Sequence, residues 1–166
     1  NNTNNGIFPN IGLDQTNEQI RQEFAKFTNE KIIPNAQKWH LNDELIPISI
    51  IDEMSELGVF GLTIPEEYGG LGLSKTAMCI VSEELSRGGI GTGSLGTRAD
   101  IAAEVILVGG NEDQKKKFLP KIARGKILPT AVFSEPDIGS DLAHLKTRAI
   151  LNGNNYEVIG NKTWIT

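Results

Sequence analysis

Hydrophobic residues recur every three or four positions from about residue 16 to residue 126, which is the spacing of one face of an α-helix. The first helix is predicted to begin at Thr16, which with Gln19 fits a capping box. Its apolar face would carry Ile20, Phe24 and Phe27. Its polar face would carry Glu18, Arg21, Gln22 and Lys26. Pro34 is expected to kink or interrupt this helix, with a second segment continuing through Trp39.

Four further helices follow from the same periodicity and from residues that favour helix ends. One has Pro47 in its first turn and stops at Gly58, and the next is capped by Ser74. After the glycines of residues 88–93, which are expected to break the chain, a helix at 94–108 carries Ile101, Val105 and Val108. The last is capped by Asn111. The four predicted segments are residues 47–57, 75–87, 94–108 and 112–123.

Residues 62–72 (LTIPEEYGGLG) contain Pro65, Gly69, Gly70 and Gly72. Proline fixes φ, and glycine permits the positive φ values that other residues avoid. The sequence therefore predicts a loop of defined shape between two helices.

The pattern changes at residue 127, where short apolar runs and turns replace the helical period. Strands are predicted at 127–133, 145–150 and 156–159, with a turn at 152–155 and a further strand at 163–166. Trp164 looks like a buried residue of that strand. A hairpin followed by nothing cannot close a sheet, so we expect this β part to be incomplete. The predicted divisions are a disordered lead-in at 1–13, a helical domain at 14–126 and the opening of a β domain at 127–166.

The composition excludes several classes of protein. With 39% hydrophobic and 22% charged residues, the chain is typical of a globular domain. A net charge of −5 argues against a nucleic-acid binder, and no apolar run is long enough for a membrane span. Cys79 is the only cysteine, which fits a reducing, cytoplasmic setting. His40 and His144 have no acidic or cysteine neighbours at metal spacing, so no metal site is predicted.

Residues 133–141 (FSEPDIGSD) combine an apolar run, a proline, a glycine and small hydroxyl side chains. Such a turn lets backbone N–H groups approach a ligand closely. Glu135, beside Pro136, is interpreted as structural, with its carboxylate bonded to local backbone.

Several stretches, taken together and in order, resemble the acyl-CoA dehydrogenase family. They are residues 64–70 (IPEEYGG), 83–87 (EELSR), 114–120 (QKKKFLP), 134–141 (SEPDIGSD) and 160–166 (GNKTWIT). The resemblance implies a mainly α chain, in which an N-terminal orthogonal or up-down helical domain is followed by the first strands of a β-barrel domain.

The resemblance also implies an oxidoreductase of fatty acid metabolism that uses FAD and removes two hydrogens from Cα and Cβ of an acyl-CoA thioester. Its partners would be the acyl-CoA substrate and an electron-transfer flavoprotein, and its assembly a homotetramer or homodimer. The family's catalytic carboxylate comes from a C-terminal region, so no residue of this chain is predicted to be the base. We expect these 166 residues alone to be inactive and to hold FAD poorly.

Individual residues match the family's cofactor positions. Phe133 and Ser134 match contacts to the flavin ring, and Gly139 and Ser140 match the turn at the cofactor pyrophosphate, where Ser140 also touches the CoA ester. The residues that match the far edge of the flavin are Trp164, Ile165 and Thr166. Two departures are Ala131, where some relatives carry an aromatic residue, and residues 137–138, which replace a common Gly-Ala.

Residues 94–98 (SLGTR) resemble the branch of the family that contains methylsuccinyl-CoA dehydrogenase. Arg98 would lie on the helix that lines the acyl pocket, where a guanidinium can pair with a substrate carboxylate. This makes a branched or dicarboxylic acyl-CoA the hypothetical substrate. The alternative for Arg98 is an ion pair at the surface or between helices.

Two other functions stay open. An acyl-CoA oxidase or flavin monooxygenase on the same fold would react with oxygen, and a non-catalytic helical binding module would bind neither FAD nor a CoA ester.

Overall fold

The computed structural model describes residues 13–165, so the predicted lead-in, apart from Leu13, and Thr166 lie outside the described residues. The chain divides into two compact units, Asn1–Pro129 and Thr130–Thr166. The first unit is helical and the second contains a small antiparallel sheet, as the predicted mainly α class requires.

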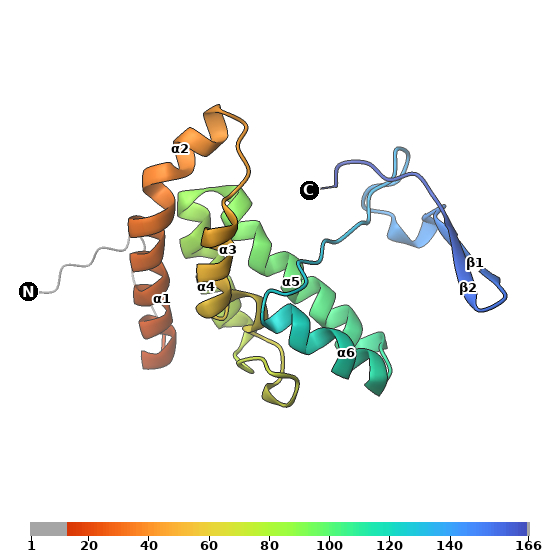
Figure 1. Ribbon diagram of the computed structural model, residues 1–166, viewed down its shortest axis with the longest axis horizontal. Helices are drawn as coiled ribbons and strands as arrows, with labels where there is room; N and C mark the ends of the chain where they lie inside the picture. Colours follow the sequence, from red (N-terminus) through yellow and green to blue (C-terminus); the bar gives the residue numbers. More distant parts are fainter. Residues whose placement is uncertain (1–12, 166) are drawn as a thin grey trace, which may run out of the picture. The chain divides into compact units, whose positions relative to one another are not determined.

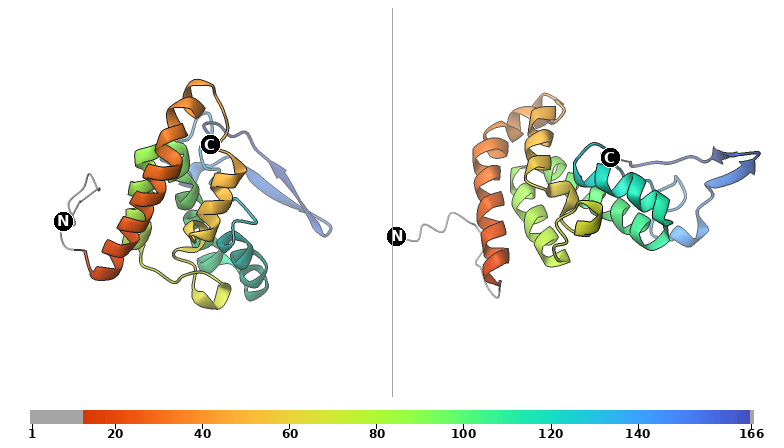
Figure 2. Two further views of the ribbon diagram at one scale, coloured as in Figure 1. Left: turned by 60° about the vertical axis from the view of Figure 1, so that its left-hand side comes forward. Right: turned by 60° about the horizontal axis from the view of Figure 1, so that its bottom comes forward.

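The helical unit is built around α4, which packs against α1 on one side and α5 on the other, while α6 lies along α5 (Figures 1 and 2). Short 3-10 turns lie between α3 and α4. The helices are α1 (Gln15–Phe27), a π-helical turn (Thr28–Ile32), α2 (Ile33–Leu41), α3 (Ile48–Glu56), α4 (Lys75–Gly88), α5 (Ile90–Gly109) and α6 (Glu112–Ala123).

Several predicted helix ends are confirmed, and the predicted starts of α1 and α5 are wrong. Ser74 and Asn111 cap α4 and α6 with their side chains, and a π-helical turn interrupts the first helix just before Pro34. The predicted cap at Thr16 is incorrect, because the side chain of Asp14 accepts the 2.8 Å hydrogen bond from the Asn17 N–H and the helix begins at Gln15. An aspartate is as good a cap as a threonine, so the competing candidate two residues upstream prevails.

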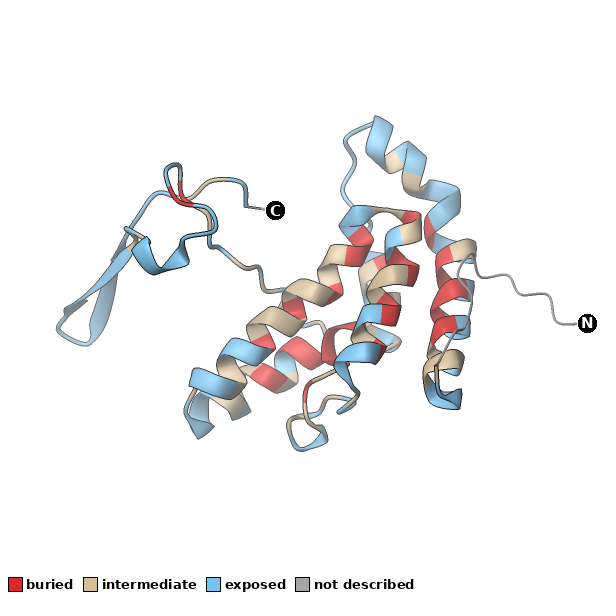
Figure 3. Cartoon of the chain, turned by 180° about the vertical axis from the view of Figure 1, so that it is seen from behind, coloured by how far each residue is buried: buried red, intermediate tan, exposed pale blue. Residues whose placement is uncertain are grey.

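The buried face of α1 lies where the helical period placed it, with one exception. Buried residues lie on the sides of the helices that face one another (Figure 3). Phe24 and Phe27 are buried, but Arg21, predicted to lie on the polar face, is only 8% exposed. Its guanidinium donates to Glu84 Oε1 at 2.9 Å and to Glu83 Oε2 at 2.7 Å. Glu84 is fully buried and also accepts from Arg87 Nε at 2.7 Å. An ion-paired cluster therefore joins α1 to α4.

Helix α5 differs most from its prediction. It begins at Ile90, so the glycines at 91 and 93 lie inside the helix rather than breaking it. Val105 and Val108, expected in the core, are 62% and 80% exposed. The buried face consists of small residues instead, because α4 and the 3-10 turn at Val59–Gly61 approach α5 closely. These residues are Thr92, Gly93, Gly96, Ala99 and Ala103.

The loop between α3 and α4 has a defined shape, as predicted. Leu71 N–H and Leu73 N–H donate to the carbonyls of Gly61 and Leu62, at 2.8 and 2.7 Å. Gly69 and Gly72 have positive φ, whereas Gly70 does not. Gly70 is instead required by the close approach of Ile64.

The second unit contains the predicted hairpin, formed by β1 (Arg148–Asn152) and β2 (Asn155–Ile159). The register pairs Arg148 with Ile159 and Asn152 with Asn155. The predicted strand at 127–133 is absent, and residues 163–165 are not a strand either. Trp164 has φ of 56° and is 90% exposed, so the expectation that it is a buried strand residue is wrong.

Candidate functional site

Two segments far apart in the sequence lie side by side in the second unit. The Thr163 N–H donates to the Ser134 carbonyl at 3.1 Å, and Lys162 Nζ donates to the Phe133 carbonyl at 2.9 Å. These contacts bring the predicted cofactor residues Phe133 and Ser134 next to the segment that carries Trp164 and Ile165.

A tight turn follows Ser134 and presents the other two predicted residues. Glu135 N–H donates to the Ile138 carbonyl at 2.9 Å, and Ile138 N–H returns a 3.1 Å bond to Glu135. The turn delivers Gly139 and Ser140 to the surface, where both are exposed. A β-carbon at Gly139 would meet no atom within 4 Å, so the space beside the turn is open to a ligand.

The carboxylate of Glu135 ties this turn to residues 146 and 147 by hydrogen bonds. The Lys146 N–H donates to Oε2 at 2.8 Å, while the N–H and hydroxyl of Thr147 donate to Oε1 at 2.9 and 2.6 Å. Lys162 Nζ lies 3.1 Å from Oε1, and the Glu135 side chain is 4% exposed. The structural interpretation of Glu135 is thus confirmed, and its local backbone partners come from the segment that enters β1.

These donors explain the ionisation of Glu135. The hydroxyl of Thr147, followed by the Lys146 N–H, lowers the pKa of the carboxyl group to about 2, because each bond favours the charged form over the protonated one. The carboxylate is therefore ionised at neutral pH. Its stabilising effect is present above pH 4.5, the ordinary value, and is lost as the pH falls towards 2.

Apolar surface gathers around the same segments. Phe133 is 42% exposed, Ile165 38%, and Trp164 almost entirely exposed. Exposed aromatic and aliphatic groups beside an exposed Gly-Ser turn fit a ligand with a flat apolar ring and an anionic part, which is the chemistry of FAD. The residues present therefore fit the predicted cofactor.

The other predicted residues lie elsewhere. Arg98 is half-buried on α5 in the helical unit, and Ala131 is half-buried at the start of the second unit. Thr166 lies outside the described residues. Lys162 and Thr147 also contact this turn and were not predicted, although Lys162 lies inside the 160–166 motif.

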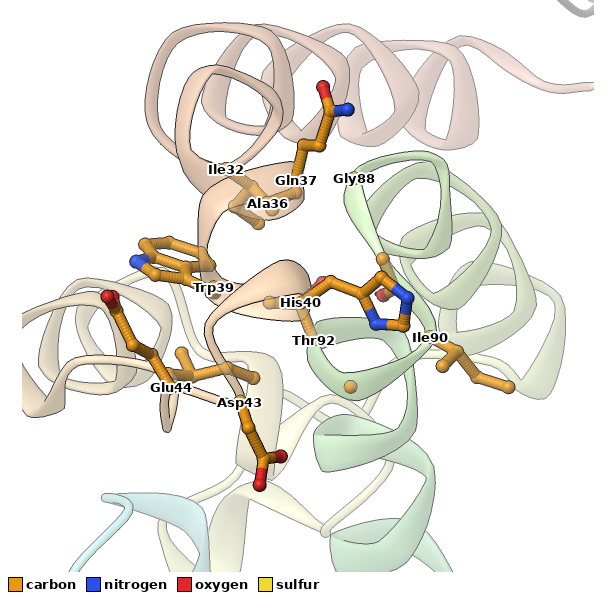
Figure 4. Close-up of a pocket in the computed structure, with 13 residues that line it drawn as sticks. Ile32, Ala36, Gln37, Trp39, His40, Asp43, Glu44, Gly88, Ile90 and Thr92 are labelled. Carbon is orange, nitrogen blue, oxygen red and sulfur yellow. The ribbon is translucent and has the colours of Figure 1, made fainter.

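The helical unit also contains a cavity of about 450 Å³ between α2, the following loop and the junction of α4 with α5 (Figure 4). Its lining is mostly apolar, with Ile32, Ala36, Trp39 and Ile90, and it also includes His40 and Asp43. No predicted site residue lines it. Between residues 13 and 165, no three His, Cys, Asp or Glu side chains come close enough together to hold a metal ion, and no helix has the length and hydrophobicity needed to cross a membrane.

The chain is similar to known proteins in sequence and in fold. Residues 14–126 match the family model of the acyl-CoA dehydrogenase N-terminal domain. The chain is 61% identical over 155 residues to (2S)-methylsuccinyl-CoA dehydrogenase from Cereibacter sphaeroides, a match that covers 93% of this chain and 28% of that protein.

Two solved structures have the same fold, each with a TM-score of 0.84. One is a glutaryl-CoA dehydrogenase from Mycobacterium smegmatis in complex with FADH2, 30% identical over 92% of this chain and 39% of that one. The other comes from work on the electron transferring flavoprotein of Acidaminococcus fermentans, 31% identical over 95% of this chain and 41% of that one. The chain thus spans less than half the length of these relatives.

Proposed function

This chain belongs to the acyl-CoA dehydrogenase family, and from that premise we propose that the complete protein oxidises the Cα–Cβ bond of an acyl-CoA thioester with FAD. The observation that carries the proposal is the contact between Ser134 and Thr163, which unites the two motifs that resemble the family's flavin site. When bound, FAD supplies the acceptor for the hydride that leaves the β carbon.

Each residue has a role that its position supports. The hydroxyl of Ser134 and the backbone of Phe133 would orient the flavin ring from one side, and Trp164 with Ile165 would cover its other edge. Gly139 and Ser140 would offer turn N–H groups to the pyrophosphate, and Ser140 would also hold the CoA ester. The base that takes the α proton would come from a region C-terminal to this chain, and the electrons would leave to an electron-transfer flavoprotein.

The substrate class is inferred from one residue of the helical unit and from the name of one relative. The named activity of the Cereibacter relative concerns a branched dicarboxylic acyl group, and Arg98 supplies a positive charge on α5. We infer that the substrate is a branched or dicarboxylic acyl-CoA whose free carboxylate pairs with the Arg98 guanidinium.

The experiment that tests the function is a dye-coupled screen of acyl-CoA esters with the complete, purified protein. We expect a yellow flavoprotein that forms the α,β-unsaturated ester and reduces the dye. Rapid aerobic turnover with peroxide as product would favour an acyl-CoA oxidase, and a hydroxylated product would favour a flavin monooxygenase. Absence of bound FAD and of CoA-ester binding would favour the helical binding module.

Arg98→Met is expected to lower kcat/KM for carboxylated acyl-CoA esters by about 10- to 100-fold, because a charge-assisted hydrogen bond of roughly 1.5–3 kcal/mol is lost. Uncharged branched esters of the same length should be affected less than about threefold. Steady-state kinetics with paired esters measure this ratio. An equal loss on both, or no loss on either, would contradict the pairing and leave Arg98 as an ion-pair partner within the protein.

A further inference from the structure

We propose that Glu135 and Lys162 act as positioning residues, forming a clamp that holds the two flavin-facing segments together and thereby sets the affinity of the protein for FAD. The inference rests on the proposed function and adds to it two residues that would not touch the reacting atoms. We call this pair the Glu135–Lys162 clamp.

Lys162 links the two segments. Its ammonium group donates to the Phe133 carbonyl at 2.9 Å and lies 3.1 Å from Glu135 Oε1. One side chain therefore contacts both the backbone next to Ser134 and the carboxylate of Glu135. The Lys162 side chain is 19% exposed, which keeps water from replacing these bonds easily. Since Thr163 and Trp164 follow directly, the position of Lys162 also fixes theirs.

The carboxylate of Glu135 is itself held in place by hydrogen bonds. Three donors from Lys146 and Thr147 hold its carboxylate from the side of the hairpin, at 2.6–2.9 Å. Its own backbone closes the turn with Ile138 that delivers Gly139 and Ser140. Three segments, 133–140, 146–147 and 162–164, therefore converge on one buried carboxylate.

The burial of the clamp gives it an effect that surface pairs in the same unit lack. When a buried ion pair loses one partner, the other charge remains without compensation and the local structure must rearrange. The pair formed by Lys146 and Asp137, by contrast, has side chains that are 71% and 77% exposed, and water replaces either partner at small cost. Loss of the clamp would separate Ser134 from Trp164 and leave the cofactor a site that is no longer preorganised.

The test measures the Kd of FAD for the complete apoprotein by fluorescence titration. Glu135→Gln and Lys162→Met are each expected to weaken FAD binding by about 10- to 100-fold, the range seen when outer partners of a metal site are removed. The double variant should weaken binding by clearly less than the product of the two single effects, because the two changes break one shared interaction. Lys146→Met removes the same kind of charge from the same unit but keeps the backbone N–H that donates to Glu135, and should change Kd by less than about twofold.

Two further measurements separate positioning from general loss of structure. At saturating FAD, the visible circular dichroism of the bound flavin should differ from that of the wild type in Lys162→Met and return in Lys162→Arg, whose guanidinium can reach both acceptors. Hydrogen exchange should show faster exchange at Thr163 N–H in the variants, with the helical unit unchanged. If either single variant does not fold, the other variant and Lys162→Arg carry the test.

The outcomes are distinct. Wild-type Kd and wild-type flavin dichroism in both folded single variants would overturn the clamp while leaving the proposed function intact. An equal loss of affinity in Lys146→Met would also overturn it, because any lost charge would then suffice. A wild-type protein that binds no FAD would overturn the proposed function, and the clamp with it.

Discussion

Glu84→Gln is expected to destabilise the helical unit by about 3–5 kcal/mol, the largest effect of any single change considered for this chain. Glu84 is fully buried and compensates two guanidinium groups, those of Arg21 and Arg87, at 2.9 and 2.7 Å. Glutamine keeps the volume but removes the charge, so both cations stay buried without their shared anion. The measurement is urea unfolding, followed by the fluorescence of the two tryptophans.

Glu83→Gln is the matched control, one residue away on the same helix. Glu83 accepts from the same Arg21 at 2.7 Å, but its side chain is 39% exposed. Water can replace the lost partner, so the expected cost is about 1 kcal/mol or less. If the two variants lost equal stability, burial would not be the reason for the effect of Glu84, and the cluster would act as an ordinary surface pair.

Arg21 shows a limit of pattern-based prediction. A charged residue between apolar positions is normally placed on the polar face, and its periodicity here gave no reason to do otherwise. Its carboxylate partners are 62 and 63 residues away in the sequence, on a helix whose packing against α1 no local pattern encodes. The apolar positions of α1 and α4 were predictable because burial repeats every turn, whereas the ion-paired cluster depends on a tertiary contact.

Helix α5 shows a second limit. Hydrophobic periodicity favoured Val105 and Val108 for the core, yet the buried face is lined by Gly93, Gly96 and Ala99. Small residues carry little hydrophobic signal, but they allow helices to approach closely, and that approach decides which face is buried. Both valines are exposed in this chain. The hydrophobic character of α5 was therefore recognised correctly, but the face of the helix that packs into the core was not.

The residues of the candidate site were easier to predict than the contacts that hold them in place. The turn at residues 133–141 was recognisable because glycine, proline and small hydroxyl residues favour a tight turn, and the motif at 160–166 was recognised from its resemblance to the family. The carboxylate of Glu135 was assigned to local backbone, which is confirmed. The ammonium of Lys162 was not anticipated, because a lysine next to a turn usually lies in solvent and only the folded contact with the Phe133 carbonyl distinguishes it.

Gly70→Ala is expected to destabilise the helical unit by about 1–3 kcal/mol, although only one methyl group is added. A β-carbon at this position would overlap the carbonyl oxygen of Ile64. That carbonyl cannot move away freely, because it accepts the Gly72 N–H at 2.9 Å and belongs to a residue that is 1% exposed. Either the hydrogen bond or the burial of Ile64 must be given up, and thermal unfolding of the complete protein measures the loss.

The same substitution at Gly109 should have the opposite sign. Gly109 is the last residue of α5, and a β-carbon there would meet no atom within 4 Å. Alanine in a helix is favoured over glycine by roughly 0.5–1 kcal/mol, because the unfolded chain loses less backbone freedom on folding. Gly109→Ala should therefore raise the melting temperature while Gly70→Ala lowers it. A rise in melting temperature for both variants would mean that the approach of Ile64 does not require glycine at position 70.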